Sequence, residues 1–556
     1  MELVYNINDR PPIKQNLVFA LQQIIAIMAA TLLVPILVSS YGLDCDPAAA
    51  LFGAGAGTIV YLLFTKFKSP VFLGSSFTFL GALEAVAAQN YGYWGLIIGV
   101  IFAALIYVII AVVIKFVGSK WIHKLLPPVI IGPILAIIGL SLAGTAGSWT
   151  MANGVKDANG NDVYNILAVI IGLFTFFMIV FASVKGKKTM KLIPFIIGIG
   201  AGFLVALIFT GFGYINNSEA CQTLRIVNCQ PLVDCFKPIR VQSFLDYPKF
   251  TFLMGILDKT PRALDGAAVG NIALLFIPIA VVELAQHISD HKNISNIVGK
   301  DVLTDPGLHR TLLGDGVGSA VGALFGGCAN TTYGESIGCV ALTGNASTST
   351  ILIASVGCML ISFFSPFVAI INMLPKCVIG GACIALYGFI AVSGLNMLRE
   401  VDLNDHKNLY PVAAILVIGI GGISLDFGTN GMEGDLKAPA VRITALAVAL
   451  IVGVLINIFT HAKSKKEKLA EGAEGGETTE TSENEVTAVF DVEPDSAVEN
   501  TVTLGENKDN VEAVEHVEHE ENIESAESVE PEAVESAVAE ESVENVASDV
   551  AIDSEE

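Results

Sequence analysis

Residues 330–335 read Asn330-Thr331-Thr332-Tyr333-Gly334-Glu335, a polar, glycine-containing stretch inside an apolar part of the chain. A similar interruption, Gly74-Ser75-Ser76-Phe77-Thr78-Phe79, lies in the first half. Backbone of this kind cannot face lipid, because its amide and carbonyl groups would have no hydrogen-bond partners. Paired interruptions in corresponding positions of two halves are typical of the binding site of a repeat-based transporter.

A second pair of segments indicates an internal repeat. The pattern Val129-Ile130-x-Gly132-x-x-x-Ala136-x-x-Gly139 recurs as Val378-Ile379-x-Gly381-x-x-x-Ala385-x-x-Gly388. This separation fits two repeats of seven membrane spans, and an odd number of spans gives the two copies opposite orientations. Inverted repeats indicate alternating access. Close helix packing explains the small residues equally well, but it does not explain the carboxylate of Glu335.

Composition places the body of the chain in a membrane. Of 556 residues, 53% are hydrophobic and 15% are charged, which excludes an ordinary soluble domain. Uncharged runs such as 15–43, 85–114 and 163–184 exceed the roughly 20 residues that cross a bilayer as a helix. The whole pattern predicts an all-α polytopic protein with about fourteen spans. The first run is too long for a cleavable signal peptide, so it is expected to remain as a span.

The predicted organisation has five parts. Basic residues that include Lys66, Lys68 and Lys115 recur in alternate loops, which predicts a multi-pass protein of the cell membrane with both termini in the cytoplasm. The parts are a cytoplasmic N-terminus at 1–14, a first seven-span repeat at 15–212, an extracytoplasmic loop at 213–266, a second seven-span repeat at 267–462 and an acidic cytoplasmic tail at 463–556.

Residues 469–556 of the tail hold 29 acidic residues and one lysine, a net charge of −28, so the rest of the chain is +5 within the total of −23. The high charge and low aromatic content of the tail predict disorder, and its partner is left open. The acidic pI therefore does not indicate a nucleic-acid-binding or nucleic-acid-mimicking protein. In the predicted outer loops, Cys45, Cys221, Cys229 and Cys235 allow one or two disulfides, and their spacing does not resemble a zinc site.

One predicted helix carries a polar stripe. Glu283, Gln286, His287 and Asp290 are spaced i, i+3, i+4 and i+7, so they lie on one face, which we expect to line the cavity. A carboxylate inside a membrane costs several kcal/mol when unpaired and is a functional candidate. The alternatives are a helix-packing network or, for Asp290, a cytoplasmic helix end. Asp315, within Gly314-Asp315-Gly316, is interpreted as the start of a span.

Four motifs together resemble the uracil permeases of the nucleobase–ascorbate (nucleobase:cation symporter-2) family. They are Asp305-Pro306-Gly307-Leu308-His309-Arg310-Thr311, the two interruptions, and Val401-Asp402-x-Asn404. The resemblance runs from about residue 10 to residue 462. It implies two inverted seven-span repeats arranged as a core and a gate domain, with short extended segments in spans 3 and 10. It also implies a homodimer and proton-coupled uptake, with no cofactor.

The resemblance also implies a binding site between the two extended segments. The nucleobase is expected to contact backbone groups at Phe77 and Gly334 and the carboxylate of Glu335. Uracil presents two N–H donors and two carbonyl acceptors, so it needs both acceptors and amide donors around its edge. Phe77 and Tyr333 are candidates for an aromatic wall.

This sequence departs from the family at several positions, which include Ser336 and Gly344 downstream of Glu335. Gln286 stands where well-known uracil permeases carry a glutamate, and Gln23 and Asp290 replace histidines. A glutamine still binds one N–H and one carbonyl, but it does not carry a proton. The remaining candidates for proton coupling are Glu283, His287, Asp290 and Glu335, and sodium coupling is the alternative.

Other functions remain open at this stage. The same fold with a purine such as xanthine or urate is the nearest alternative, although purine transporters of the family commonly carry glutamine at the position of Glu335. An anion exchanger or channel on this architecture is a different class, and the Glu335 carboxylate argues against it. No metal-ligand spacing, phosphate loop or nucleophile with a base supports an enzyme.

Overall fold

The computed structural model describes residues 3–118, 121, 127–156, 162–164, 166–187, 190–191, 193–215, 223–258, 264–326, 328–399, 401–427 and 441–461. The acidic tail predicted at 463–556 and Cys221 lie outside the described residues. Cys45, Cys229 and Cys235 are free thiols, so the described part of the outer segments contains no disulfide.

Apolar helices make up most of the described chain. Eight segments are long and apolar enough to cross a membrane: α1 (Ile13–Ser40), α2 (Pro47–Phe64), α4 (Gly92–Val117), α6 with α7 (Pro128–Ser141 and Ala143–Met151), α8 (Ile166–Val184), α10 (Pro194–Ile215), α14 (Gly266–Val298) and α19 (Lys376–Leu398). Three shorter apolar helices are α17 (Thr348–Ile361), α20 (His406–Ile420) and α21 (Ala445–Thr460).

The remaining segments of the membrane body include the two interruptions. They are α15 (Leu308–Gly326), β1 (Leu73–Ser75) followed by α3 (Leu80–Ala88), and β4 (Asn330–Thr332) followed by α16 (Gly334–Thr343). Within the described residues this gives seven segments before the outer loop and seven after it. The predicted polytopic α-helical fold, with extended segments in the third and tenth positions, is confirmed.

Smaller elements connect these segments. They are the hairpins β2–β3 (Ala152–Lys156 and Asp162–Tyr164) and β5–β6 (Leu425–Phe427 and Val441–Ile443), the helices α12 (Gln230–Phe236), α13 (Thr251–Leu257) and α18 (Ser365–Asn372), and the single turns η1 (Val241–Ser243) and η2 (Leu303–Gly307).

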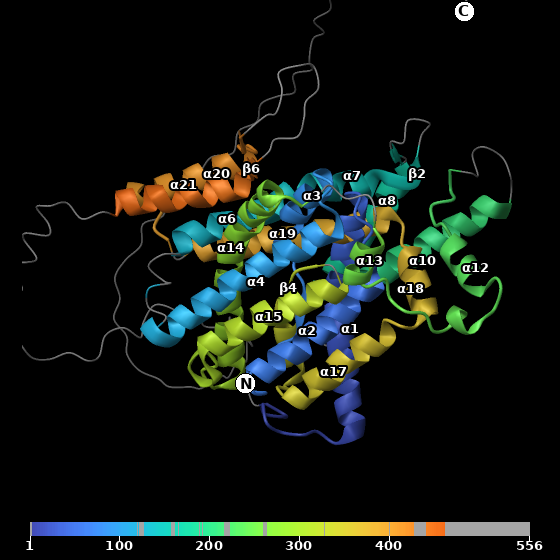
Figure 1. The fold of residues 1–556 in the computed structure, drawn as a ribbon. Helices are drawn as coiled ribbons and strands as arrows, with labels where there is room; N and C mark the ends of the chain where they lie inside the picture. Colours follow the sequence, from blue (N-terminus) through green and yellow to red (C-terminus); the bar gives the residue numbers. More distant parts are fainter. Residues whose placement is uncertain are drawn as a thin grey trace, which may run out of the picture. The chain divides into compact units, whose positions relative to one another are not determined.

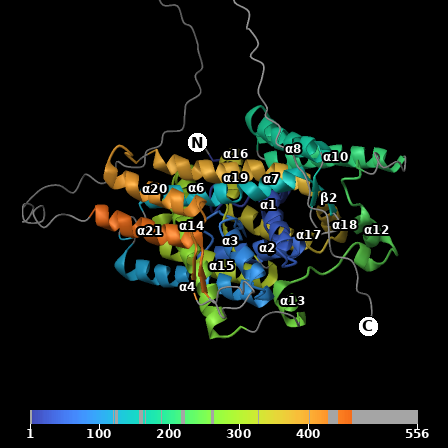
Figure 2. The same cartoon turned by 90° about the horizontal axis from the view of Figure 1, so that it is seen from above.

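The helices pack as two groups, which we call the core and the gate. In the core, α15 packs on α2 and α4, while α1 packs on α2 and α17. In the gate, α19 packs on α6, α7 and α8, and α20 packs on α6 and α21. The two views agree that the gate helices α6, α19 and α20 lie along one side of the core (Figures 1 and 2). Each group draws helices from both repeats, as expected for inverted repeats.

Glycines hold the repeat-related helices α6 and α19 close together. A Cβ on Gly139 would lie 2.5 Å from the carbonyl oxygen of Tyr387 and 2.6 Å from the amide nitrogen of Ala391. Gly132 similarly faces the backbone of Gly394. The small residues of the repeated motif therefore serve close backbone packing at this contact.

The two interruptions meet in the middle of the molecule. β1 and β4 pair antiparallel, with Leu73 opposite Thr332, Gly74 opposite Thr331 and Ser75 opposite Asn330. All six residues are buried. Pairing each strand with the other repeat satisfies backbone groups that lipid could not satisfy.

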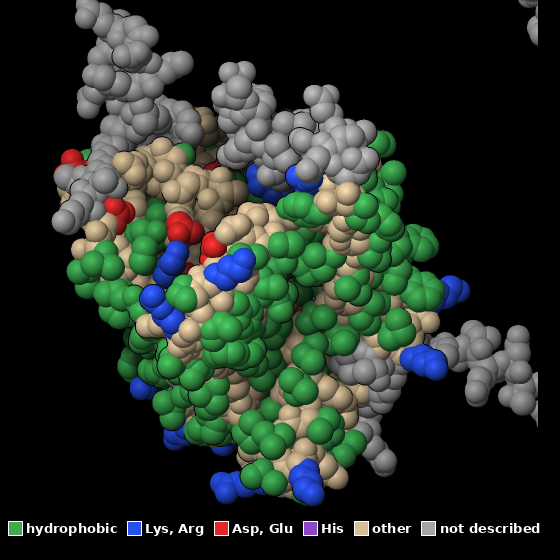
Figure 3. Space-filling model, turned by 90° about the vertical axis from the view of Figure 1, so that its right-hand side faces the viewer, with side chains coloured by type: hydrophobic (Ala, Val, Ile, Leu, Met, Phe, Trp, Pro, Cys, Tyr) green, Lys and Arg blue, Asp and Glu red, His purple; other side chains and the backbone are tan. Residues whose placement is uncertain are grey.

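The outer faces of the helices are apolar. Large exposed side chains include Ile101, Leu105 and Ile109 on α4, Phe177 on α8, and Leu204, Ile208 and Phe212 on α10. Hydrophobic side chains cover much of the face shown in Figure 3. Such a surface suits lipid and not water.

One end of the bundle carries the predicted basic residues, and we call it the basic end. The turn after α2 carries Lys66 and Lys68, and Lys68 Nζ lies 2.7 Å from the Asp305 carboxylate in the turn before α15. The N-terminal strand lies at the same end of α1, where the Val4 amide donates to the Gly344 carbonyl beyond α16.

Candidate functional site

The crossing of β1 and β4 is held by contacts that depend on a glycine. The Tyr333 ring lies across Gly74, where a Cβ would overlap the ring. The Tyr333 hydroxyl donates to the Ser75 carbonyl over 2.7 Å, and its amide donates to the Phe72 carbonyl. Tyr333, a predicted wall residue, is thus buried and clamps β1.

The first turn of α16 is open on one side. Gly334 is exposed, and no atom lies within 4 Å of the Cβ position it leaves empty. The first amides of a helix have no partner inside the helix and carry the positive end of its dipole. Backbone amide donors and the Glu335 carboxylate therefore stand side by side at this helix start.

Glu335 lines a cavity of about 140 Å³ between the core helices and α10, which packs on the gate helices α8 and α19. The cavity follows one face of α16 through Cys339 and Leu342, and it is also lined by Ala29 of α1 and by residues 193–196 that lead into α10. Lys191 lines it as well, in the basic segment between α8 and α10. The cavity thus extends from Glu335 toward the basic end.

Phe77 contacts the gate directly. Its ring meets the Tyr387 ring of α19 edge to face, with the centroids 6.2 Å apart. The Tyr387 hydroxyl is buried and has no hydrogen-bond partner. Sequence reasoning missed Tyr387, although it stands just before Gly388, the last residue of the repeated motif.

The four side chains of the polar stripe on α14 differ in how far they are buried. Gln286 is half-buried, whereas Glu283, His287 and Asp290 are buried inside the core. Asp290 accepts a hydrogen bond of 2.8 Å from the Thr332 hydroxyl of β4. The stripe was expected to line the cavity as a whole, but three of its four side chains face neighbouring core elements.

Glu283 is buried without a basic partner among the described contacts. It is 1% exposed, and neither carboxylate oxygen has a hydrogen-bond partner. Its surroundings include the hydroxyl groups of Ser76, Thr78 and Thr331. Glu283 therefore lies where the ends of both extended segments meet α14.

Asp315 does not lie at the start of a span, so that interpretation is wrong. It is fully buried within α15, and its Oδ2 lies 2.6 Å from His287 Nδ1. His287 Nε2 lies 3.0 Å from the Thr311 hydroxyl. The repeat of small residues around Asp315 allows α15 to pack tightly against α2 and α4, which encloses the side chain.

Gln23, the residue in place of a family histidine, supports the helix start from α1. It is buried, and its side-chain amide donates to the Ser336 carbonyl over 3.3 Å. Among the residues that the structure describes, no group of three or more His, Cys, Asp or Glu side chains is arranged to hold a metal ion.

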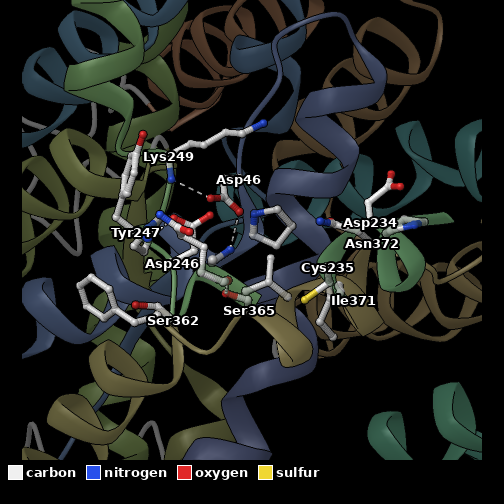
Figure 4. Close-up of a pocket in the computed structure, with 18 of the residues that line it drawn as sticks. Asp46, Asp234, Cys235, Asp246, Tyr247, Lys249, Ser362, Ser365, Ile371 and Asn372 are labelled. Carbon is white, nitrogen blue, oxygen red and sulfur yellow. Dashed lines mark hydrogen bonds between the residues drawn. The ribbon is translucent and has the colours of Figure 1, made fainter. Parts of the chain in front are cut away.

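A larger cavity, about 700 Å³, opens at the opposite end of the molecule. The segment 231–249 covers the ends of α1 and α2 there, and Figure 4 shows Asp46, Asp246 and Lys249 gathered on one side of it. The Asp46 carboxylate caps α2 and also accepts from the Lys249 amide over 2.8 Å. Neither extended segment lines this cavity.

Comparison with known proteins identifies the family. A sequence model described as a permease family matches residues 14–426. The chain belongs to this permease family. The match confirms the resemblance inferred from the motifs, and the permease is a transporter and not an enzyme.

Its relatives match over nearly their full length. The chain is 37% identical over 459 residues to the uracil permease of Bacillus caldolyticus, which covers 82% of this chain and 94% of the relative. It is 34% identical to the uracil permease of Bacillus subtilis and 32% identical to that of Escherichia coli, covering 82% and 81% of this chain and 94% of each relative.

Solved structures confirm the fold of the permease. The murine Solute Carrier 26 family member A9 anion transporter, solved in the inward-facing state, aligns with a TM-score of 0.51 and 13% identity. The alignment covers 81% of this chain and 69% of that one. At this identity the likeness concerns the fold alone.

Proposed function

We propose that this permease imports uracil across the plasma membrane by proton symport, through an alternating-access mechanism. The observation that carries the proposal is the open helix start at Gly334 and Glu335, where Glu335 lines a cavity between core and gate. The uracil permeases that match at 32–37% identity support the choice of substrate. Assembly as a homodimer, with both termini in the cytoplasm, belongs to the same proposal.

The chemistry of the site suits a pyrimidine with two N–H groups and two carbonyls. In the proposed complex, the Glu335 carboxylate accepts from an N–H of uracil, while free backbone amides at the start of α16 donate to a carbonyl. Gln286 is half-buried and supplies one further donor and one acceptor. Each group that the ligand fails to pair leaves a buried polar atom unsatisfied, which gives selectivity.

Alternating access is proposed to open the site first to one end and then to the other. The cavity at Glu335 leads toward the basic end, which we assign to the cytoplasm because positive residues favour that side. Phe77 on the core and Tyr387 on the gate form an aromatic contact that relative movement of the two groups would break. The present structure then corresponds to a conformation that releases substrate inward.

Coupling to protons requires a titratable group near the substrate, because Gln286 carries no charge. Of the four candidates, Glu283 fits best: it is buried, unpaired and close to both extended segments. A buried carboxylate without partners is stabilised by binding a proton. One proton moving through about 100 mV releases about 2.3 kcal/mol, which supports roughly fifty-fold accumulation.

The proposal is tested by uptake of labelled uracil and xanthine into vesicles at acidic and neutral outside pH. A protonophore, sodium and chloride are varied in turn, and Glu335→Gln is the paired variant. We expect acid-stimulated uracil uptake that the protonophore abolishes and that Glu335→Gln loses.

Three results would contradict the proposal in different ways. Xanthine uptake without uracil uptake would make the protein a purine permease. Uracil uptake that depends on sodium and not on pH would refute proton coupling alone. Chloride movement without nucleobase transport would indicate an anion exchanger or channel on the same fold.

A further inference from the structure

A buried hydrogen-bonded chain leads from the core toward the basic end. His291 Nε2 lies 2.6 Å from the Tyr61 hydroxyl, which lies 2.6 Å from the Ser69 hydroxyl. All three side chains are fully buried. In the sequence Ser69 directly follows Lys68, whose side chain is 44% exposed at the basic end. The hydrogen-bonded chain therefore ends at a buried serine whose neighbour in sequence, Lys68, lies at the surface.

The inner end of this hydrogen-bonded chain lies next to the buried His287–Asp315 pair. The His287 and His291 rings stack with their centroids 4.0 Å apart, and His287 is bound to Asp315. Asp315 Oδ1 is buried without a hydrogen-bond partner, as are both oxygens of Glu283. Ionisable groups thus follow one another from the substrate region to the surface.

The positions of the protons follow from the partners. His291 Nδ1 lies 2.7 Å from the His287 backbone carbonyl, which only accepts, so Nδ1 bears a proton. In the neutral ring Nε2 is then free to accept from the Tyr61 hydroxyl. Because a phenol carries one proton, Tyr61 donates either to Ser69, as in the 2.6 Å hydrogen bond between their hydroxyls, or to His291. When His291 is an imidazolium, its Nε2–H donates to Tyr61 and Tyr61 donates to Ser69, so the donors then point from the core toward the surface.

We propose that Asp315, His287, His291, Tyr61 and Ser69 form a proton relay between the core and the cytoplasm, separate from the substrate cavity. The inference rests on the proposed proton symport. None of these five residues lines the cavity at Glu335. Uracil and the proton therefore leave the protein by different routes.

Proton release balances as a shift along the chain. A proton held between Asp315 and His287 passes to His291, which becomes an imidazolium. Its Nε2 proton then moves to the Tyr61 oxygen as the Tyr61 proton moves to Ser69. The Ser69 proton moves to water that must enter beside Lys68 from the cytoplasmic side, because Ser69 itself is fully buried. Among the described contacts no hydrogen bond joins the two imidazole rings, so the first transfer requires a ring to rotate.

Other ionisable groups lie around the proposed relay. Facing it are Tyr107 of α4, whose ring meets His287 edge to face, and the carboxylates of Glu283 and Asp290 on α14. Lys292 is partly exposed next to His291 on α14. At the outlet stand the Lys68–Asp305 pair and Arg310, which reaches the Phe64 carbonyl.

The test uses the full chain in proteoliposomes that contain a pH-sensitive dye. Tyr61→Phe and His291→Gln remove the relay groups at two positions, and Tyr93→Phe is the matched control because its hydroxyl bonds the Asp44 carbonyl at the far end. Uracil-driven proton movement, net uracil uptake and uracil counterflow are measured for each. Counterflow exchanges substrate without requiring proton release.

We expect both relay variants to lower proton movement and the maximal rate of net uptake by about a hundredfold, the usual effect of removing a positioned proton-transfer group. Half-saturation by uracil and counterflow stay at the wild-type level, and Tyr93→Phe behaves like the wild type. Retained counterflow also shows that the variants are folded. Wild-type proton movement in both variants would overturn the relay while leaving symport intact. Uracil counterflow without proton movement in the wild type would overturn symport and the relay together.

Discussion

The Tyr333 ring occupies the space that a Cβ on Gly74 would fill. The two residues belong to opposite repeats, and their contact fixes how β1 and β4 cross at the proposed binding site. This position therefore tolerates only glycine while Tyr333 keeps its hydrogen bond to Ser75.

Replacing Gly74 with alanine is expected to damage the site. The added methyl must displace the Tyr333 ring, at an overpacking cost of about 1–3 kcal/mol. Uracil binding, measured by equilibrium dialysis on purified protein, should fall sharply. Gly81→Ala is the control, because nothing lies within 4 Å of its Cβ position. Equal binding by the two variants would contradict this account of Gly74.

The repeated motif allows a second comparison between two glycine-to-alanine variants. Gly139→Ala forces the α6 and α19 backbones apart and should lower the Tm, again by an overpacking cost of about 1–3 kcal/mol. Gly388 occupies the equivalent place in the second copy, but its Cβ would meet no atom within 4 Å. Gly388→Ala should leave the Tm unchanged or raise it. Similar melting of both variants would show that the sequence repeat, and not the local contact, governs stability.

Gln286 should contribute to uracil affinity as a hydrogen-bonding group. Gln286→Ala leaves its partners unpaired, at about 1–3 kcal/mol, which corresponds to roughly tenfold to hundredfold weaker binding. Gln242→Ala, in the cavity at the other end, provides the same change away from the site. An unchanged half-saturation constant in Gln286→Ala would exclude Gln286 from the site.

Asp46 and Lys249 should differ in their effect on stability, although both line the larger cavity. Asp46→Ala removes the cap of α2, worth about 1 kcal/mol, and the acceptor for the Lys249 amide. Lys249→Ala loses only an exposed ion pair, with Nζ 3.6 Å from Asp44, and should be nearly silent. Thermal denaturation of the purified variants compares them, and Asp46→Asn should keep most of the cap. A larger loss in Lys249→Ala would point to a different role for that side chain.

The proposed orientation gives a labelling prediction. In a chain whose Cys221, Cys229 and Cys235 are replaced by serine, Lys68→Cys should react with a membrane-impermeant maleimide only from the cytoplasmic side. Lys249→Cys should react only from outside, because the two residues lie at opposite ends of the bundle. The reverse pattern would invert the topology and turn the relay outlet outward.

Much of the site could be predicted because its signals are local. The polar interruptions at 74–79 and 330–335 stand out against apolar surroundings, and the structure pairs them as β1 and β4. His291 was missed, although it lies four residues after His287 and continues the polar face of α14. Its partner Tyr61 could not be found in this way, because the contact joins residues 230 positions apart.

Hydropathy and turn chemistry act over short stretches of chain, so the membrane class, the repeats and the two broken segments could be predicted from the sequence. Which polar groups meet depends on tertiary packing. Glu283, Gln286, His287 and Asp290 share one helix face in the sequence, yet packing of α14 against α15 and β4 buries three of them and leaves Gln286 partly open. Asp315 became a buried partner of His287 for the same reason, since burial depends on the neighbouring helices and not on the segment that carries the residue.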